Sequence, residues 1–163
     1  MKLYISIVLY VFIRVIQLLR AFFRLFQRTN PCSSASMSKI LLVEDDIFLS
    51  ALLKNRLLKE GFEVNLARDG EEALSFLKTT KPDLILLDLI LPKKSGFEVM
   101  EEIRQDPQMQ GQELPIIIIS NLGQPEDVSR GQELGAIEYF VKAKTSIDEL
   151  VEKIKSFLEK SRP

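Results

Sequence analysis

From Met37 onward, short apolar runs alternate with stretches of helical periodicity, and this alternation restricts the fold more than any other feature. The runs that predict strands lie at 40–43, 62–66, 84–87, 116–119 and 137–141. The stretches that predict helices lie at 47–60, 70–79, 95–105, 125–134 and 146–160. The first, third and fourth runs are almost wholly apolar, as in parallel strands that helices cover on both faces. The sequence therefore predicts an α/β domain over residues 37–163, with a doubly wound, five-stranded parallel sheet.

Residues 1–36 have a different character. Five of the 22 basic residues and none of the 23 acidic residues lie there, so this segment carries a charge of +5 and the remainder −6. Residues 3–13 form an uncharged apolar run, and arginines then recur at near-helical spacing opposite an apolar face. This pattern predicts an apolar and basic helical extension that contacts a membrane through residues 1–28. Residues 29–38, with Pro31 and several serines, are typical of a linker.

A second interpretation of residues 1–36 fits the sequence equally well. The segment 37–43 has the form of a natural start, in which Met37 leads directly into the first strand. The preceding residues then come from a misassigned initiation codon, and the protein is cytoplasmic. If the extension is real, we expect attachment to the inner face of the membrane.

Composition excludes several classes of function. The domain that begins at Met37 is acidic, which argues against direct nucleic-acid binding, because phosphates require a basic face. The chain has no histidine, so neither a Ser-His-Asp nor a Cys-His mechanism can operate within it, and a zinc site is not expected. Cys32 is the single cysteine and cannot form an internal disulfide. The side chains that remain available for a reactive site are carboxylates, lysines and hydroxyls.

Acidic residues follow two of the predicted strands. Glu44 and Asp45 come directly after the run 40–43, and Asp88 directly after the run 84–87. Parallel strands end at the same edge of a sheet, so these three carboxylates are expected to converge. Like charges in one cleft repel unless a hard cation neutralises them, and oxygen ligands suit Mg²⁺. We therefore expect a Mg²⁺-supported carboxylate, open to solvent, that attacks a phosphoryl group. Asp46 is expected to cap the following helix instead.

Four motifs carry a resemblance to a known family. They lie at 40–46, at 86–92 together with Gly96, at 118–120 and at 139–142. In this order and spacing, they resemble the receiver domain of bacterial two-component response regulators, over about residues 38–160. The resemblance is to single-domain regulators like those of chemotaxis. It implies a flavodoxin-like sheet of order 2-1-3-4-5 and phosphoryl transfer from a sensor histidine kinase or phosphotransfer protein.

The resemblance also implies roles for the acidic residues. Asp88 matches the phosphoacceptor, whose carboxylate attacks phosphohistidine to give an acyl phosphate. Asp45 matches a direct Mg²⁺ ligand, and Glu44 an acidic neighbour that contributes through water. The backbone carbonyl of Ile90 matches a further metal ligand, so its side chain is free to vary.

Three other residues match the family's phosphoryl-binding and switch positions. Lys142 matches the lysine that pairs with the phosphoryl group. Ser120 matches a hydroxyl that bonds a phosphoryl oxygen and draws its loop inward. Tyr139 matches an aromatic switch whose ring follows that movement, although a partly buried structural tyrosine explains it as well.

Several positions beside the expected site depart from the family pattern or modify its chemistry. Ala143 follows Lys142 where the family usually has proline, so we expect a trans peptide bond there. Ile90 and Leu122 occupy positions that influence hydrolysis of the acyl phosphate. Both side chains are apolar and cannot orient a water molecule, which predicts a slowly decaying phosphoryl state.

The leading functional hypothesis is a phosphorylation-controlled binding module that is not an enzyme. We expect no output domain after the last predicted helix, and therefore expect an output partner to dock near helix 125–134 and Tyr139. A phosphate shuttle in a relay is a variant of this role. Two other classes are a phosphorylation-independent, receiver-like interaction domain and an aspartate-nucleophile phosphatase. The phosphatase is disfavoured because Ile90 stands where such enzymes carry a general acid.

Overall fold

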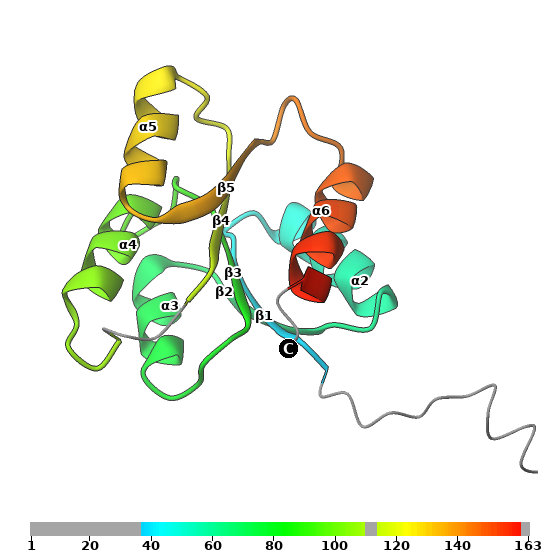
Figure 1. Ribbon diagram of the computed structural model, residues 1–163, viewed down its shortest axis with the longest axis horizontal. Helices are drawn as coiled ribbons and strands as arrows, with labels where there is room; N and C mark the ends of the chain where they lie inside the picture. Colours follow the sequence, from blue (N-terminus) through cyan, green and yellow to red (C-terminus); the bar gives the residue numbers. More distant parts are fainter. Residues whose placement is uncertain (1–36, 110–113, 161–163) are drawn as a thin grey trace, which may run out of the picture. The chain divides into compact units, whose positions relative to one another are not determined.

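The computed structural model describes residues 37–109 and 114–160, which form five consecutive strand–helix units (Figure 1). The strands are β1 (Lys39–Val43), β2 (Glu63–Ala67), β3 (Leu84–Leu87), β4 (Ile116–Ser120) and β5 (Ala136–Val141). The helices are α2 (Ile47–Lys59), α3 (Gly70–Leu77), α4 (Gly96–Gln105), α5 (Pro125–Glu133) and α6 (Ile147–Lys160). All neighbouring strands pair in parallel, in the order β2-β1-β3-β4-β5. This confirms the predicted flavodoxin-like fold and strand order.

Helices cover both faces of the sheet. Figure 1 shows α2 and α6 on one side and α3, α4 and α5 on the other. Alternate residues of β1 supply the two cores: Ile40 and Leu42 pack with α2 and α6, and Leu41 and Val43 pack with α3 and α4. Every residue of β3 and β4 is buried, as expected for central strands of such a sheet.

Local signals in the sequence place the helix ends. Asp46 caps α2 by accepting hydrogen bonds from the amides of Phe48 and Leu49, at 2.8 and 2.9 Å, which confirms the predicted cap. Ser95 opens α4 in a capping box with Glu98. Chain reversal after α2 uses Gly61, whose φ of 87° lies in the region that favours glycine.

The extension predicted over residues 1–36, its contact with a membrane and the linker lie outside the described residues. Within the described ranges, no helix is both long and apolar enough to span a bilayer.

Candidate functional site

The carboxyl ends of β1 and β3 bring the three predicted acids together. The amide of Asp88 donates to the carbonyl of Val43 at 3.0 Å, and the amide of Glu44 donates to the carbonyl of Ala67 at 3.0 Å. The hydrogen bonds between neighbouring strands therefore continue one residue past the ends of β1 and β3. One carboxylate oxygen from each of Glu44, Asp45 and Asp88 lies within 4.8 Å of the other two. Convergence of the acidic residues, expected from the strand ends, is therefore present in the structure.

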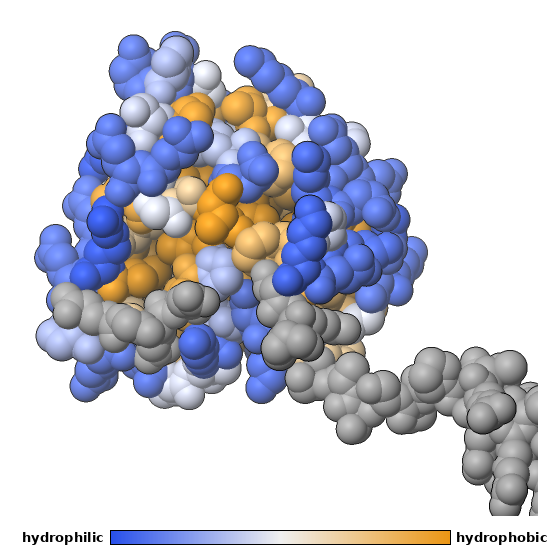
Figure 2. Space-filling model, viewed as in Figure 1, coloured by the Kyte–Doolittle hydropathy of each residue, from blue (hydrophilic) through white to orange (hydrophobic). Residues whose placement is uncertain are grey.

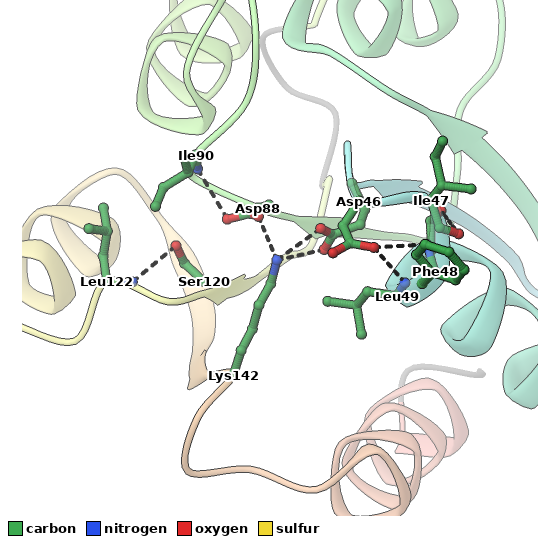
Figure 3. A network of polar contacts seen from close by, with 11 residues as sticks. Asp46, Ile47, Phe48, Leu49, Asp88, Ile90, Ser120, Leu122 and Lys142 are labelled. Carbon is green, nitrogen blue, oxygen red and sulfur yellow. Dashed lines mark hydrogen bonds and ion pairs between the residues drawn. The ribbon is translucent and has the colours of Figure 1, made fainter.

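Lys142 joins this cluster from the end of β5. Its amide donates to the carbonyl of Ser120 at 2.9 Å, which aligns the end of β5 with β4. Its ammonium lies 2.7 Å from Oε2 of Glu44. It also lies 2.5 Å from Oδ2 of Asp88 (Figure 3). All three side chains are at least 87% buried, so this ion pair is shielded from water and salt.

The charges of the cluster influence one another. Burial raises the pKa of Glu44 above its usual value, against the opposing effect of Lys142. Burial lowers the pKa of Lys142, but its hydrogen bonds to Asp88 and Glu44 outweigh this, and the net pKa is raised. Lys142 therefore stays protonated through the physiological pH range and supplies a permanent cation to an otherwise anionic site.

Asp88 is more enclosed than the sequence predicted. The residue is only 5% exposed, and the expectation of a carboxylate open to solvent is wrong. Its Oδ2 contacts Lys142, and its Oδ1 accepts a hydrogen bond from the amide of Ile90 at 3.1 Å (Figure 3). The exposed Asp45 and the 54% exposed Ile90 mark the side from which a reactant can approach.

The start of α4 closes the loop that follows Asp88. The amide of Gly96 donates to the carbonyl of Leu89 at 3.0 Å. A Cβ atom at Gly96 would lie 2.3 Å from the carbonyl oxygen of Asp88. Only glycine permits this approach, which explains physically why Gly96 belongs to the motif around Asp88.

The donor set suits a hard divalent cation. Opposite ligands of one Mg²⁺ lie about 4 Å apart, so carboxylate oxygens within 4.8 Å of one another have the right spacing. Three carboxylates and one ammonium leave an excess of negative charge for a cation to neutralise. Asp45 and Asp88 are the candidate direct ligands, and Glu44 is the candidate for a contribution through water.

The two predicted switch residues meet at one peptide segment. Ser120 is fully buried, and its Oγ accepts a hydrogen bond from the amide of Leu122 at 3.3 Å. The hydroxyl of Tyr139 donates to the carbonyl of Leu122 at 2.9 Å. Sequence reasoning missed this link, because no local pattern shows that both side chains bond the same residue. The half-buried ring of Tyr139 also lies beside Gly131 of α5.

The loop after Lys142 holds its shape without proline. Every peptide bond in the described ranges is trans, as predicted for the bond before Ala143. The amides of Lys144 and Thr145 both donate to the carbonyl of Val141, at 2.9 and 3.1 Å, forming a tight turn. Lys142 therefore reaches Asp88 despite the replacement of the usual proline.

Comparison with known proteins agrees with this geometry. The family model of the response regulator receiver domain matches residues 40–155. The chain belongs to the response regulator receiver family. Receiver domains are signalling domains of two-component systems that interact with a histidine kinase or other phosphodonor, which confirms the resemblance inferred from the four motifs.

Curated relatives are longer than this chain. It is 43% identical over 125 residues to the transcriptional regulatory protein CpxR of Klebsiella pneumoniae, covering 77% of this chain and 51% of CpxR. It is 39% identical over 127 residues to the phosphate regulon transcriptional regulatory protein PhoB of Rhizobium meliloti, covering 78% and 55%. The chain thus spans about half the length of the curated relatives it matches.

Solved receiver structures cover the same region. The Francisella response regulator 1452 receiver domain superposes with a TM-score of 0.69 at 27% identity, over 77% of this chain and 99% of that one. The Vibrio cholerae chemotaxis protein CheY4 gives a TM-score of 0.66 at 29% identity, over 74% and 98%. The part of this chain that matches therefore corresponds to nearly the whole length of each of these two receiver structures.

Proposed function

We propose that this chain is a phosphorylation-controlled receiver in which Asp88 accepts a phosphoryl group from a phosphohistidine. The observation that carries this proposal is the Lys142 ammonium between Asp88 and Glu44, with Asp45 in the same cluster. Phosphoryl transfer needs a nucleophile and a cation. Here a carboxylate of the cluster provides the nucleophile, and the buried lysine beside it provides the cation.

In this proposal a carboxylate oxygen of Asp88 attacks the phosphorus atom of the donor. A P–O bond forms, the P–N bond breaks, and the electron pair returns to the imidazole nitrogen. Lys142 pairs with a phosphoryl oxygen, and the amide of Ile90 keeps the carboxylate oriented. Asp45, Asp88 and the Ile90 carbonyl would hold a Mg²⁺ ion, which would supply positive charge to neutralise the phosphoryl oxygens.

The same contacts suggest how the signal leaves the site. The hydroxyl of Ser120 turns from the Leu122 amide toward a phosphoryl oxygen, and Leu122 moves with it. Tyr139, which donates to the Leu122 carbonyl, then changes position against α5. Phosphorylation shifts the population between two packings, and a protein partner docks near α5 and Tyr139. Absence of direct nucleic-acid contact by residues 37–163 remains a prediction.

Phosphorylation of the full chain by acetyl phosphate and Mg²⁺ tests the proposal. We expect a phosphate-affinity gel to show a shifted band for the parent and none for Asp88→Asn. Asp46→Asn is the matched control, since it removes a neighbouring charge yet keeps a residue that caps α2. A shifted band in Asp88→Asn would contradict the assignment of Asp88. A folded parent without any shift would favour the phosphorylation-independent domain.

The lifetime of the acyl phosphate is a second test. Ile90 is 54% exposed beside Asp88 and presents no group that can orient an attacking water. We expect the phosphorylated parent to decay over many minutes and Ile90→Asn to decay several-fold faster, as followed by the loss of the shifted band. A parent half-life of seconds, unchanged by Ile90→Asn, would contradict this expectation.

A further inference from the structure

The loop between β3 and α4 contains a strained residue, Lys93. Its φ of 64° is the only positive φ of a non-glycine residue in the described ranges 37–109 and 114–160. The amide of Lys94 donates to the carbonyl of Pro92 at 2.8 Å, so Lys93 is the centre of a γ-turn. A γ-turn with positive φ is rare and strained, and it persists only where surrounding contacts hold it.

Asp69, at the start of α3, provides such a contact. Nζ of Lys93 lies 2.6 Å from Oδ2 of Asp69, while Oδ1 of Asp69 accepts a hydrogen bond from the amide of Glu72 at 2.8 Å and caps α3. The Asp69 side chain is only 12% exposed. The hydrogen bond from Lys93 holds the pKa of Asp69 below its usual value. One carboxylate therefore ties the loop to a fixed helix end.

The β3–α4 loop packs closely against neighbouring backbone at two glycines, Gly70 and Gly96. A Cβ atom at Gly70, next to Asp69, would lie 2.5 Å from the carbonyl oxygen of Lys94. At the far end, Gly96 packs against the backbone of Asp88 and Leu89. Ile90, the candidate carbonyl ligand, lies in the short segment between these contacts. A shift of Lys93 is therefore transmitted to a segment with little freedom of its own.

We propose that Lys93 is a positioning residue for the metal site, whose ion pair with Asp69 holds the β3–α4 loop, and with it the Ile90 carbonyl, in place for a bound cation. This inference rests on the proposed function. Lys93 touches neither the acidic cluster nor a reacting atom in this arrangement. Its ammonium is paired with Asp69, and Glu71 lies 3.8 Å away.

The competing explanation is a solvated surface lysine, since the Lys93 side chain is 56% exposed and exposed ion pairs contribute little. The two explanations predict opposite effects of Lys93→Met on Mg²⁺ affinity. Loss of a cation near an acidic site by itself strengthens Mg²⁺ binding. Loss of a positioning contact weakens it, by about tenfold if the effect resembles that of other residues that orient metal ligands.

The experiment is titration of the full chain with Mg²⁺ by isothermal calorimetry. Lys94→Met is the matched control, because Lys94 lies in the same loop but pairs with Glu102 of α4 rather than with α3. We expect weaker binding in Lys93→Met and in Asp69→Asn, whose amide still caps α3, and unchanged or tighter binding in Lys94→Met. Parent-like affinity in Lys93→Met, or equal weakening in Lys94→Met, overturns the positioning role.

A metal-free readout separates this inference from the proposed function. Hydrogen exchange of the amides in residues 89–95 is expected to rise several-fold in Lys93→Met and not in Lys94→Met. Faster exchange together with weaker Mg²⁺ binding supports the positioning role. If the parent binds no Mg²⁺, the proposed metal site itself fails and the positioning role fails with it. If the parent binds Mg²⁺ and exchange in the loop is unchanged, only the positioning role fails.

Discussion

The two helices beside β5 are held in contrasting ways. Helix α6 buries four apolar residues against the sheet, on the stripe that its periodicity predicts: Leu150, Val151, Ile154 and Leu158. Helix α5 buries only Gly131. Burial of a large aliphatic side chain contributes about 1.5–3 kcal/mol, so α6 is fixed by the core and α5 is not.

Polar contacts at its surface hold α5 instead. The Arg130 guanidinium pairs with Glu101 of α4 at 2.9 Å and lies 4.2 Å from the centroid of the Phe97 ring. Nη1 of Arg104 donates to the carbonyl of Glu133 at 2.6 Å. Gln124 begins the helix without a side-chain cap. Such contacts are individually weak, so displacement of α5 costs less than displacement of α6.

The difference between α5 and α6 indicates which part of the fold would respond to the proposed phosphorylation of Asp88. Tyr139 lies against Gly131 of α5 and bonds the Leu122 carbonyl, so the movement of Leu122 in the proposed switch would act on the weakly held helix. Figure 2 shows apolar surface over β5, in the middle of the face that is drawn there, with hydrophilic surface on either side of it. Ile137 of β5 is 45% exposed. These features support the proposed docking of a partner near α5.

Truncation of the α6 core is expected to have the largest effect. Ile154→Ala should destabilise the domain by about 2–5 kcal/mol, because it leaves a cavity in a fully buried position. Val128→Ala, on the half-buried face of α5, should cost less than about 1 kcal/mol. Urea unfolding of both variants measures the contrast, and equal losses would contradict it.

Enlarging the single buried residue of α5 should have an intermediate effect. A Cβ atom at Gly131 would already lie 2.6 Å from Cδ1 of Ile118, so Gly131→Leu must displace the helix. We expect a loss of about 1–3 kcal/mol, as is typical of overpacking. Hydrogen exchange should then increase in α5 and stay unchanged in α6. Uniform loss of protection in both helices would show that they are not independent.

Removal of the main polar contact of α5 should have a smaller effect. Arg130→Met loses the Glu101 ion pair and the interaction with Phe97, together about 0.5–1 kcal/mol for exposed groups. The control is Lys153→Met on the exposed side of α6, which should be neutral. Thermal unfolding measures both variants, and hydrogen exchange in α5 should rise only in Arg130→Met. Unchanged exchange there would mean that other contacts hold the helix.

The smallest expected effect is a pH dependence on the α6 side. Hydrogen bonds from Lys155 and Arg56 lower the pKa of Glu60 below its usual 4.5. A lowered folded-state pKa contributes stability that is present above the unfolded-state value and lost as pH falls through the folded-state value. The stability of the parent should therefore exceed that of Glu60→Gln at pH 7, and the difference should shrink below about pH 4.5. A difference that does not change with pH would contradict this role of the ion pairs.

Much of the molecule follows from local sequence. Strand 84–87 was predicted without error, and the other elements differ from their predicted bounds by a residue or two, because apolar periodicity reports burial better than it reports element ends. Asp46 caps the start of α2, and Gly61 takes the positive φ after the end of α2; both roles follow from the residue type and its place beside the helix. The acidic cluster was also predictable, since parallel strands must end at one edge.

Other features depend on contacts between distant segments. Neither the enclosure of Asp88 nor the shared bonding of Ser120 and Tyr139 to Leu122 follows from any local pattern. The strain at Lys93 and its pairing with Asp69 likewise depend on how closely two loops approach.

By itself, the sequence determined the α/β fold, the strands and helices, and the residues that meet at the carboxyl edge of the sheet, because burial periodicity and capping are properties of short segments. Only the tertiary structure decided how open Asp88 is, which residues support the loop beside it, and that Ser120 and Tyr139 both bond Leu122. Those properties depend on how closely groups far apart in the chain approach one another, and no spacing along the sequence encodes such distances.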